Sequence, residues 1–132
     1  LHPVVHLHVF NSKGELYLQK RPEWKDIQPG KWDTSVGGHV DLGESIDIAL
    51  NREAREELGI TDFNPERLTH YVFESEREKE LVFSFRATID DTISPSDELD
   101  GGRFWGLDDI RQNIGKGIFT PNFESEFKRL GF

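Results

Sequence analysis

Residues 38–60 read GHVDLGESIDIALNREAREELGI, and they contain the clearest helix signal in the sequence. Apolar residues recur every four positions from Ile46 to Leu58, which places them in one row along a helix. Ser45 or Asp47 could serve at its start, and Gly59 follows the last apolar residue as a stop signal. The pattern therefore predicts a helix over residues 45–58 with one buried side.

The predicted helix also carries three glutamates, Glu53, Glu56 and Glu57, beside the apolar row. At about 100° per residue they span roughly 100° of arc, so their charges repel one another. Oxygen-rich clusters of this kind bind hard cations such as Mg²⁺, and Arg52 could fix one glutamate by a bidentate ion pair. The alternative is a solvated acidic face balanced by Arg52 and Arg55, because charge runs often decorate helix surfaces.

The residues around these glutamates make the pattern much more specific. Nine constrained positions over 23 residues resemble the Nudix box, with Ala54 small for its apolar position. The matching residues are Gly38, Glu44, Arg52, Glu53, Ala54, Glu56, Glu57, Gly59 and Ile60. The resemblance extends more loosely to the strand order on both sides and so covers most of the chain.

This resemblance implies a Nudix-like α/β/α sandwich and a hydrolase that cleaves a diphosphate linkage, with a nucleoside diphosphate derivative as the expected substrate. It implies that Mg²⁺ or Mn²⁺ is held by Glu53, Glu56 and Glu57 together with the backbone carbonyl of Gly38. The chemistry agrees, since attack of water on an anionic phosphate needs charge neutralisation and an activated water. A binding module that has lost catalysis would not need the intact box.

Further roles follow from the resemblance by position. Arg52 would orient Glu53, and Glu44 would support the metal ligands or stabilise the box. Family members differ in the carboxylate that accepts the proton from water, so Glu53, Glu57 and the loop residue Glu98 are all candidates. Glu98 could equally be a solvated loop acid.

Flanking residues also resemble the isopentenyl-diphosphate isomerases, a branch of the same fold that does not hydrolyse its substrate. Arg21 and Lys25 match the basic pair that binds diphosphate in that branch, or they are ordinary surface charges. Three further residues fall where that branch places metal ligands, although they could be structural or turn residues: His39, Glu78 and Glu80. The isomerases have Cys at the position of Gly37, and this sequence has no Cys, so isomerisation is not expected.

Length and charge narrow the remaining function classes. The 132 residues suit one domain, and a net charge of −9 argues against binding the nucleic-acid backbone. No run is long and apolar enough for a membrane span, no signal peptide is evident, and the absence of Cys fits a cytoplasmic setting. We expect a small-molecule diphosphate as partner, with a homodimer left open. Leu1 is not expected to be the natural start, because the sequence has no Met.

Alternation and turn residues predict the other elements. Strands are expected at 4–10, 16–20, 32–40 with an interruption at 37–38, 67–74, 80–89 and 104–105, and short helices at 108–114 and 124–130. A mixed sheet covered on both sides would result.

Some histidines and aromatic residues have two possible roles, in ligand binding or in packing. His6 and His8 share one face of the first strand, close to His2, and either bind a metal or pack on that face. The same choice, between stacking on a base and packing in the core, applies to Trp24, Trp32, Tyr71, Phe85 and Trp105.

Overall fold

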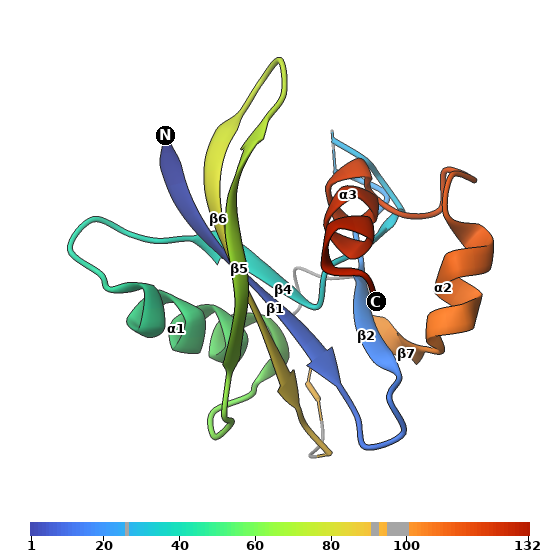
Figure 1. Cartoon of the computed structure of the whole chain (residues 1–132), viewed down its shortest axis with the longest axis horizontal. Coiled ribbons are helices and arrows are strands. Elements are labelled where there is room, and N and C mark those ends of the chain that lie inside the picture. Colours follow the sequence, from blue (N-terminus) through green and yellow to red (C-terminus); the bar gives the residue numbers. More distant parts are fainter. Residues whose placement is uncertain (26, 91–92, 95–100) are drawn as a thin grey trace.

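Helices cover both faces of a mixed β-sheet in the computed structural model, which describes residues 1–25, 27–90, 93–94 and 101–132 (Figure 1). The strands are β1 (His2–Phe10), β2 (Leu16–Lys20), β3 (Trp32–Asp33), β4 (Val36–His39), β5 (Glu66–Glu74), β6 (Lys79–Thr88) and β7 (Gly102–Trp105). The helices are α1 (Ile46–Leu58), α2 (Leu107–Asn113) and α3 (Pro121–Leu130). The strand order is β3-β2-β1-β6-β5, with β4 paired to β1 and β7 to β2. The predicted α/β/α sandwich is confirmed.

Strand β1 organises the sheet, and the sheet forks along one of its edges. One edge of β1 runs parallel to β6 over its full length, which makes the sheet mixed. On the other edge, β4 pairs antiparallel with Val4 to Leu7, whereas β2 pairs with β1 only at Phe10 and Leu16. Ser35 bridges the fork, because its Oγ accepts a hydrogen bond from Val9 N and donates one to the carbonyl of Tyr17.

Two apolar clusters hold the helices against the sheet. Alternating residues Val5, Leu7 and Val9 of β1 pack under α1 with Leu50 and Leu58. The second cluster joins β2 and β7 to α2 and α3, and its buried members are Phe10, Leu16, Leu18, Trp105, Ile110, Phe119, Phe123 and Phe127. Alternation along a strand thus directs neighbouring side chains of β1 to opposite layers.

Helix α1 has the expected ends. Ser45 is the N-cap residue, and its Oγ accepts a hydrogen bond from Ile48 N at 3.2 Å. Gly59 closes the helix with a left-handed backbone at φ 69°, which glycine adopts without strain. Of the two residues considered for the start, Ser45 rather than Asp47 fills the capping position.

Two predicted boundaries were wrong in an informative way. Gly37 and Gly38 lie within β4 and pair with His6 and Val5, so they do not interrupt the strand. Helix α3 begins at Pro121, three residues earlier than expected, because Thr120 caps it by accepting a hydrogen bond from Phe123 N. None of the helices in the described part of the chain is long and apolar enough to cross a membrane.

Candidate active site

A cavity of about 610 Å³ lies where the fork in the sheet meets α1. Its wall contains Glu53, Glu56 and Glu57 from α1, and Gly37 and Gly38 from β4. The other lining residues come from the strands, the loop before β3, the β5–β6 hairpin and α3: Val4, His6, Gln19, Arg21, Pro22, Lys25, Asp33, Thr34, His39, Glu78, Glu80 and Asn122. Segments far apart in the sequence therefore meet around the glutamates.

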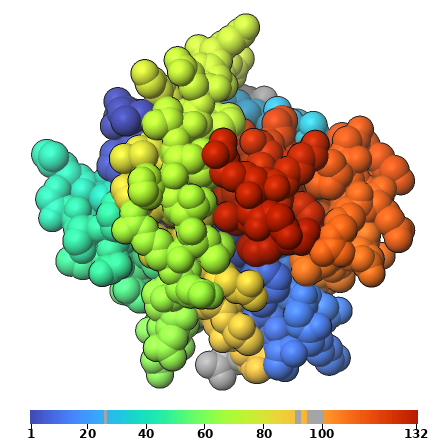
Figure 2. Space-filling view, in the orientation of Figure 1, coloured from blue at the N-terminus to red at the C-terminus, as the bar shows by residue number. Residues whose placement is uncertain are grey.

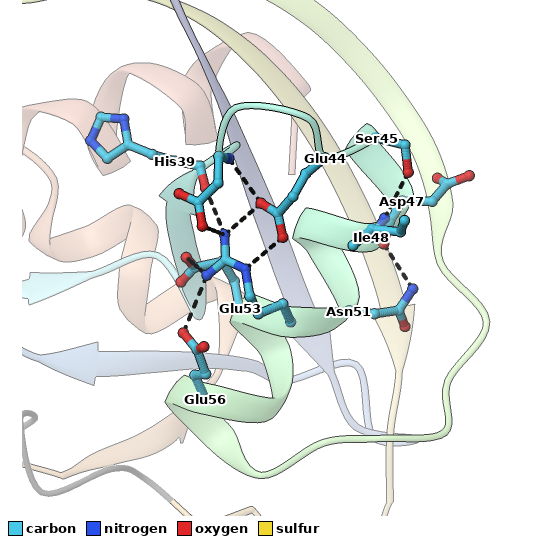
Figure 3. Close-up of polar contacts among 10 residues, drawn as sticks. His39, Glu44, Ser45, Asp47, Ile48, Asn51, Glu53 and Glu56 are labelled. Carbon is cyan, nitrogen blue, oxygen red and sulfur yellow. Dashed lines mark hydrogen bonds and ion pairs between the residues drawn. The ribbon is translucent and has the colours of Figure 1, made fainter.

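Arg52 ties the glutamates of α1 to the loop that precedes the helix. It makes a bidentate pair with Glu44, with Nε to Oε2 at 2.7 Å and Nη2 to Oε1 at 2.9 Å. Its Nη1 donates to Glu53 at 2.7 Å and to Glu56 at 3.3 Å, and Nη2 also donates to the carbonyl of His39 at 3.0 Å (Figure 3). All five N–H groups of the guanidinium thus have acceptors, which fixes its plane.

Glu44 belongs to this network as an anchor for Arg52. The hydrogen bonds from Arg52, and then one from Asp41 N at 2.8 Å, lower the pKa of Glu44 to about 2. The hydrogen bonds to Glu44, and then the contact with Glu53, raise the pKa of Arg52. Glu44 lines neither cavity described for this structure, so its place is behind the glutamates of α1.

The carboxylate of Glu57 is partly buried. Its Oε1 accepts hydrogen bonds from Gln19 Nε2 at 2.9 Å and from Gly37 N at 3.4 Å. Its Oε2 is buried and has no hydrogen-bond donor among the described residues. Burial first, and neighbouring Glu53 second, raise the pKa of Glu57 to about 9. Two adjacent carboxylates therefore lie in the cavity wall with too little positive charge to stabilise both as anions.

Gly38 makes room for Glu53. A Cβ added at Gly38 would lie 2.1 Å from the carboxyl carbon of Glu53 and within 2.5 Å of both its oxygens. Contacts this short do not occur between atoms that are not bonded, so any side chain here would displace the carboxylate. The glycine lets the backbone of β4 approach the carboxylate closely.

The chemistry of these donors fits a hard divalent cation. Carboxylate and backbone carbonyl oxygens are the ligands that such cations prefer, and the unpartnered Oε2 of Glu57 is a donor in need of positive charge. In the described part of the chain, no three His, Asp or Glu side chains are already gathered as a metal cluster. Glu56 is turned toward Arg52. The carboxylates of Glu53 and Glu57 are neighbours, and that of Glu53 lies against the backbone of Gly38.

Two cations from the loop after β2 line the same cavity. Arg21 is held by a hydrogen bond from its Nε to the carbonyl of Ile27 at 3.0 Å and lies 3.8 Å from Asp33. The Nζ of Lys25 lies 4.8 Å from the ring centre of Trp24. The structure thus brings the predicted basic pair and the glutamates of α1 to one cavity.

The isomerase-like positions line the same cavity. His39, Glu78 and Glu80 all line the cavity, and burial, followed by the charge of Glu78, raises the pKa of Glu80. The ring of His39 lies edge-on to that of His2 at 6.1 Å. Gly37 contributes no side chain to the cavity.

Several lining residues were not foreseen from the sequence. Gln19, which holds Glu57, was treated only as part of a strand, although a polar residue in the run LYLQ was a usable signal. His6 was considered for packing or metal binding and lines the cavity wall. The loop candidate Glu98 lies outside the described residues.

A second cavity of about 520 Å³ adjoins the first and shares Arg21, Asp33, Glu78 and Asn122 with it. None of the five aromatic residues considered for stacking on a base lines either cavity. Phe85 and Trp105 are buried in the core, and Trp32 packs edge-on to Trp105. An aromatic residue that the sequence did not single out, Phe73, lines the second cavity.

Comparison with known proteins agrees with this architecture. The NUDIX domain family matches residues 1–123. An uncharacterized Nudix hydrolase of Listeria monocytogenes is 33% identical over 93% of this chain and 74% of its own length. An isopentenyl-diphosphate Δ-isomerase of Photorhabdus laumondii is also 33% identical, over 96% of this chain and 77% of its own.

Solved structures extend the likeness to three dimensions. A crystal structure of a Deinococcus radiodurans protein matches with a TM-score of 0.86 at 25% identity, over 99% of this chain and 83% of that one. A MutT protein of Methanosarcina mazei matches with a TM-score of 0.81 at 28% identity, over 98% of this chain and 91% of its own. Sequence and fold agree over nearly the whole chain, which therefore belongs to the Nudix family.

Proposed function

We propose that the chain is a metal-dependent hydrolase that cleaves a diphosphate linkage, with a nucleoside diphosphate derivative as the substrate class. The observation that carries the proposal is one cavity that holds both the acidic residues Glu53 and Glu57 and the cations Arg21 and Lys25. A diphosphate placed there would meet side-chain cations on one side and metal-binding carboxylates on the other.

The residues that would hold Mg²⁺ or Mn²⁺ are Glu53, Glu56 and Glu57, with the backbone carbonyl of Gly38. When bound, such an ion neutralises phosphate oxygens and lowers the pKa of a water molecule. Arg52 contributes by fixing the carboxylate of Glu53 through a 2.7 Å hydrogen bond. A carboxylate then accepts the proton of the attacking water, with Glu53, Glu57 and Glu98 as the candidates.

The remaining chain residues bind and orient the substrate. Arg21 and Lys25, which line the cavity, would hold phosphate oxygens in the ground state and the transition state alike. The second cavity, with the ring of Phe73 and the amide of Asn122 in its wall, would take the group attached to the diphosphate. Comparing nucleotide derivatives with inorganic pyrophosphate tests this assignment, because pyrophosphate has no group that could fill the cavity.

A substrate panel tests the activity. Nucleotide sugars, dinucleotides, nucleoside triphosphates and prenyl diphosphates are incubated with Mg²⁺ or Mn²⁺, and release of phosphate or nucleotide is followed. We expect hydrolysis of a nucleoside diphosphate derivative that releases a nucleoside monophosphate, stops with EDTA and returns with added metal. Full activity in the presence of chelator would contradict the proposal.

Substitutions connect that activity to the glutamates. Glu57→Gln and Glu53→Gln should each lower kcat by at least about a hundredfold, as expected for a lost metal ligand or general base. The fold should survive, because each change keeps the side-chain shape and removes a repelling charge. Glu66→Gln, at an exposed position of β5 outside both cavities, is the matched control. Near-normal turnover in both α1 variants would exclude the proposed site.

The similarity to an isomerase of isopentenyl diphosphate makes isomerisation the second candidate. Moving an isolated double bond requires a proton delivered to carbon on one face and another removed from the opposite face. Gly37 has no side chain for either step, and the sequence has no thiol. Isopentenyl diphosphate with Mg²⁺ should therefore give no dimethylallyl isomer by proton NMR. Formation of that isomer, without hydrolysis of any nucleotide in the panel, would favour the isomerase instead.

A further inference from the structure

A buried cluster of titratable residues joins the cavity to α3. Glu126 of α3 is fully buried, and its carboxylate contacts His6, His8 and Tyr71. His6 Nδ1 lies 2.8 Å from Oε1, His8 Nε2 bonds to Oε2, and the hydroxyl of Tyr71 donates to Oε1. Strand β5, which carries Tyr71, and α3 lie side by side on the molecular surface (Figure 2).

The geometry indicates which histidine balances the charge of Glu126. His8 is fully buried, and its Nδ1 has no hydrogen-bond partner in the described part of the chain, so a proton there would be unsatisfied. The side chain of His6 is 15% exposed. Burial alone lowers the pKa of His6, but Glu126, with smaller contributions from Asp33 and Glu80, raises it overall. The compensating proton therefore belongs on His6.

The contact with Glu126 also determines which atom of His6 faces the cavity. Because Nδ1 donates to the carboxylate, Nε2 is the ring nitrogen left for another partner. No protein group in the described ranges accepts from it. A Cβ added at Gly37 would lie 3.4 Å from Cδ2 and 3.7 Å from Nε2, so this edge of the ring lies beside the glycine. His6 and Gly37 both line the 610 Å³ cavity.

We propose that His6 is a phosphate-binding residue, donating its Nε2–H to an oxygen of the substrate's diphosphate, with Glu126 as its positioning residue. The inference rests on the proposed function, because it places the diphosphate in the same cavity. A buried charged cluster adds little net stability compared with apolar packing, so stability does not account for an imidazole that reaches the cavity wall. The glycine at position 37 leaves this ring edge open to a ligand.

Binding of methylenediphosphonate, a diphosphate that cannot be hydrolysed at its bridge, tests the proposal. Affinity is measured by isothermal titration calorimetry with Mg²⁺ present. His6→Gln should weaken binding about ten- to a hundredfold, the range for a hydrogen bond to a charged group. His8→Gln is the matched control, because His8 also contacts the carboxylate of Glu126 but does not line the cavity. The affinity of this variant for methylenediphosphonate should stay within about threefold of that of the unsubstituted chain. Equal weakening in both variants, or none in His6→Gln, would overturn the proposal.

Glu126→Gln tests the positioning role. It should raise KM on the best substrate more than it lowers kcat, because His6 remains but loses its charge and fixed orientation. A KM that stays within about twofold of normal in the folded variant would contradict this role. Circular dichroism identifies the variants that fold.

A measurement on the unsubstituted chain does not depend on how the variants fold. In ¹⁵N-labelled protein at about pH 6, below the ordinary pKa of 6.5, both ring nitrogens of His6 should be protonated. Methylenediphosphonate should shift the Nε2 resonance of His6 but not the resonances of His8. An unchanged His6 resonance at saturation would overturn the proposal. If instead the resonance shifts and no diphosphate in the panel is hydrolysed, the hydrolase proposal fails and the phosphate-binding role of His6 stands.

Discussion

Gly38→Ala places a methyl group where the carboxylate of Glu53 now lies, and its consequences can be worked out from the structure. The added Cβ would be 2.1 Å from the carboxyl carbon, whereas ordinary contacts begin near 3.4 Å. The carboxylate must therefore retreat by roughly 1.3 Å, away from β4. A displacement of about 1 Å in a catalytic group lowers turnover by on the order of a hundredfold.

The effect on stability should be much smaller. The atoms in the way belong to the end of a flexible side chain, so Glu53 can change rotamer at a cost of about 0.5–1.5 kcal/mol. For a chain of this size that corresponds to a lowering of Tm by about 4 °C. Gly37→Ala is the matched comparison in the same strand, since its Cβ would meet only His6, at an ordinary 3.4 Å.

The assay combines kcat on the best substrate, Mn²⁺ affinity by calorimetry and thermal unfolding for both alanine variants. Gly38→Ala should lose turnover and metal affinity together, while Gly37→Ala should keep its metal affinity, because its Cβ would lie against His6 and not against Glu53. In a Glu53→Gln background, Gly38→Ala should add little further loss, because both changes act through one carboxylate. Normal turnover and metal affinity in Gly38→Ala would refute the reasoning that Glu53 must lie against the backbone of β4.

Two further predictions concern charge. Arg21→Ala combined with Lys25→Ala should raise KM more than it lowers kcat. Lys13→Ala, at an exposed turn, is the control and should leave both constants unchanged. An unaltered KM in the double variant would show that Arg21 and Lys25 are ordinary surface charges. Glu126→Gln should lower the free energy of unfolding by about 3 kcal/mol, because it leaves a buried ion pair without one partner. Its effect should be greatest between the ordinary pKa values of 4.5 and 6.5. The stabilisation from the lowered pKa of Glu126 is lost as pH falls below that window. The stabilisation from the raised pKa of His6 is lost as pH rises above it. In urea unfolding, Glu126→Gln should therefore lower the free energy of unfolding more at about pH 5.5 than at about pH 9.

Local pattern predicted the elements well where periodicity and end signals agree. Helix α1 has an apolar row, a capping Ser45 and a closing Gly59, and all three signals point to the same boundaries. The predicted start of α3 was three residues late, although Thr120 followed by Pro121 is a start signal. Glycine weakens strands in general, and the predicted interruption at residues 37–38 agrees with that general tendency and not with the structure. The reason for the glycines is tertiary, since Gly38 accommodates a carboxylate from α1.

The candidate site, too, could be predicted only where its residues are close in the sequence. The spacing within one helix was enough to group Glu53 with Glu57, since helix geometry is regular. The contact of His6 with Glu126 spans 120 positions of the sequence, and no local pattern can pair residues so far apart. Glu126 reads as an ordinary polar residue of a surface helix, and only the packing of α3 against β1 and β5 makes it a buried acid.

The fork in the sheet explains how one cavity receives groups from both layers. Alternation along β1 directs Val5 toward α1 and His6 toward α3, so an unbroken sheet would keep the two layers apart. Because β1 pairs with β4 over Val4 to Leu7 and with β2 only at Phe10, the sheet opens between β4 and β2. Glutamates of α1 reach this opening from one side, and His6, backed by Glu126, reaches it from the other. Closing the fork by extending the β1–β2 pairing would therefore separate the proposed metal ligands from the proposed phosphate-binding imidazole, even if every one of these residues were retained.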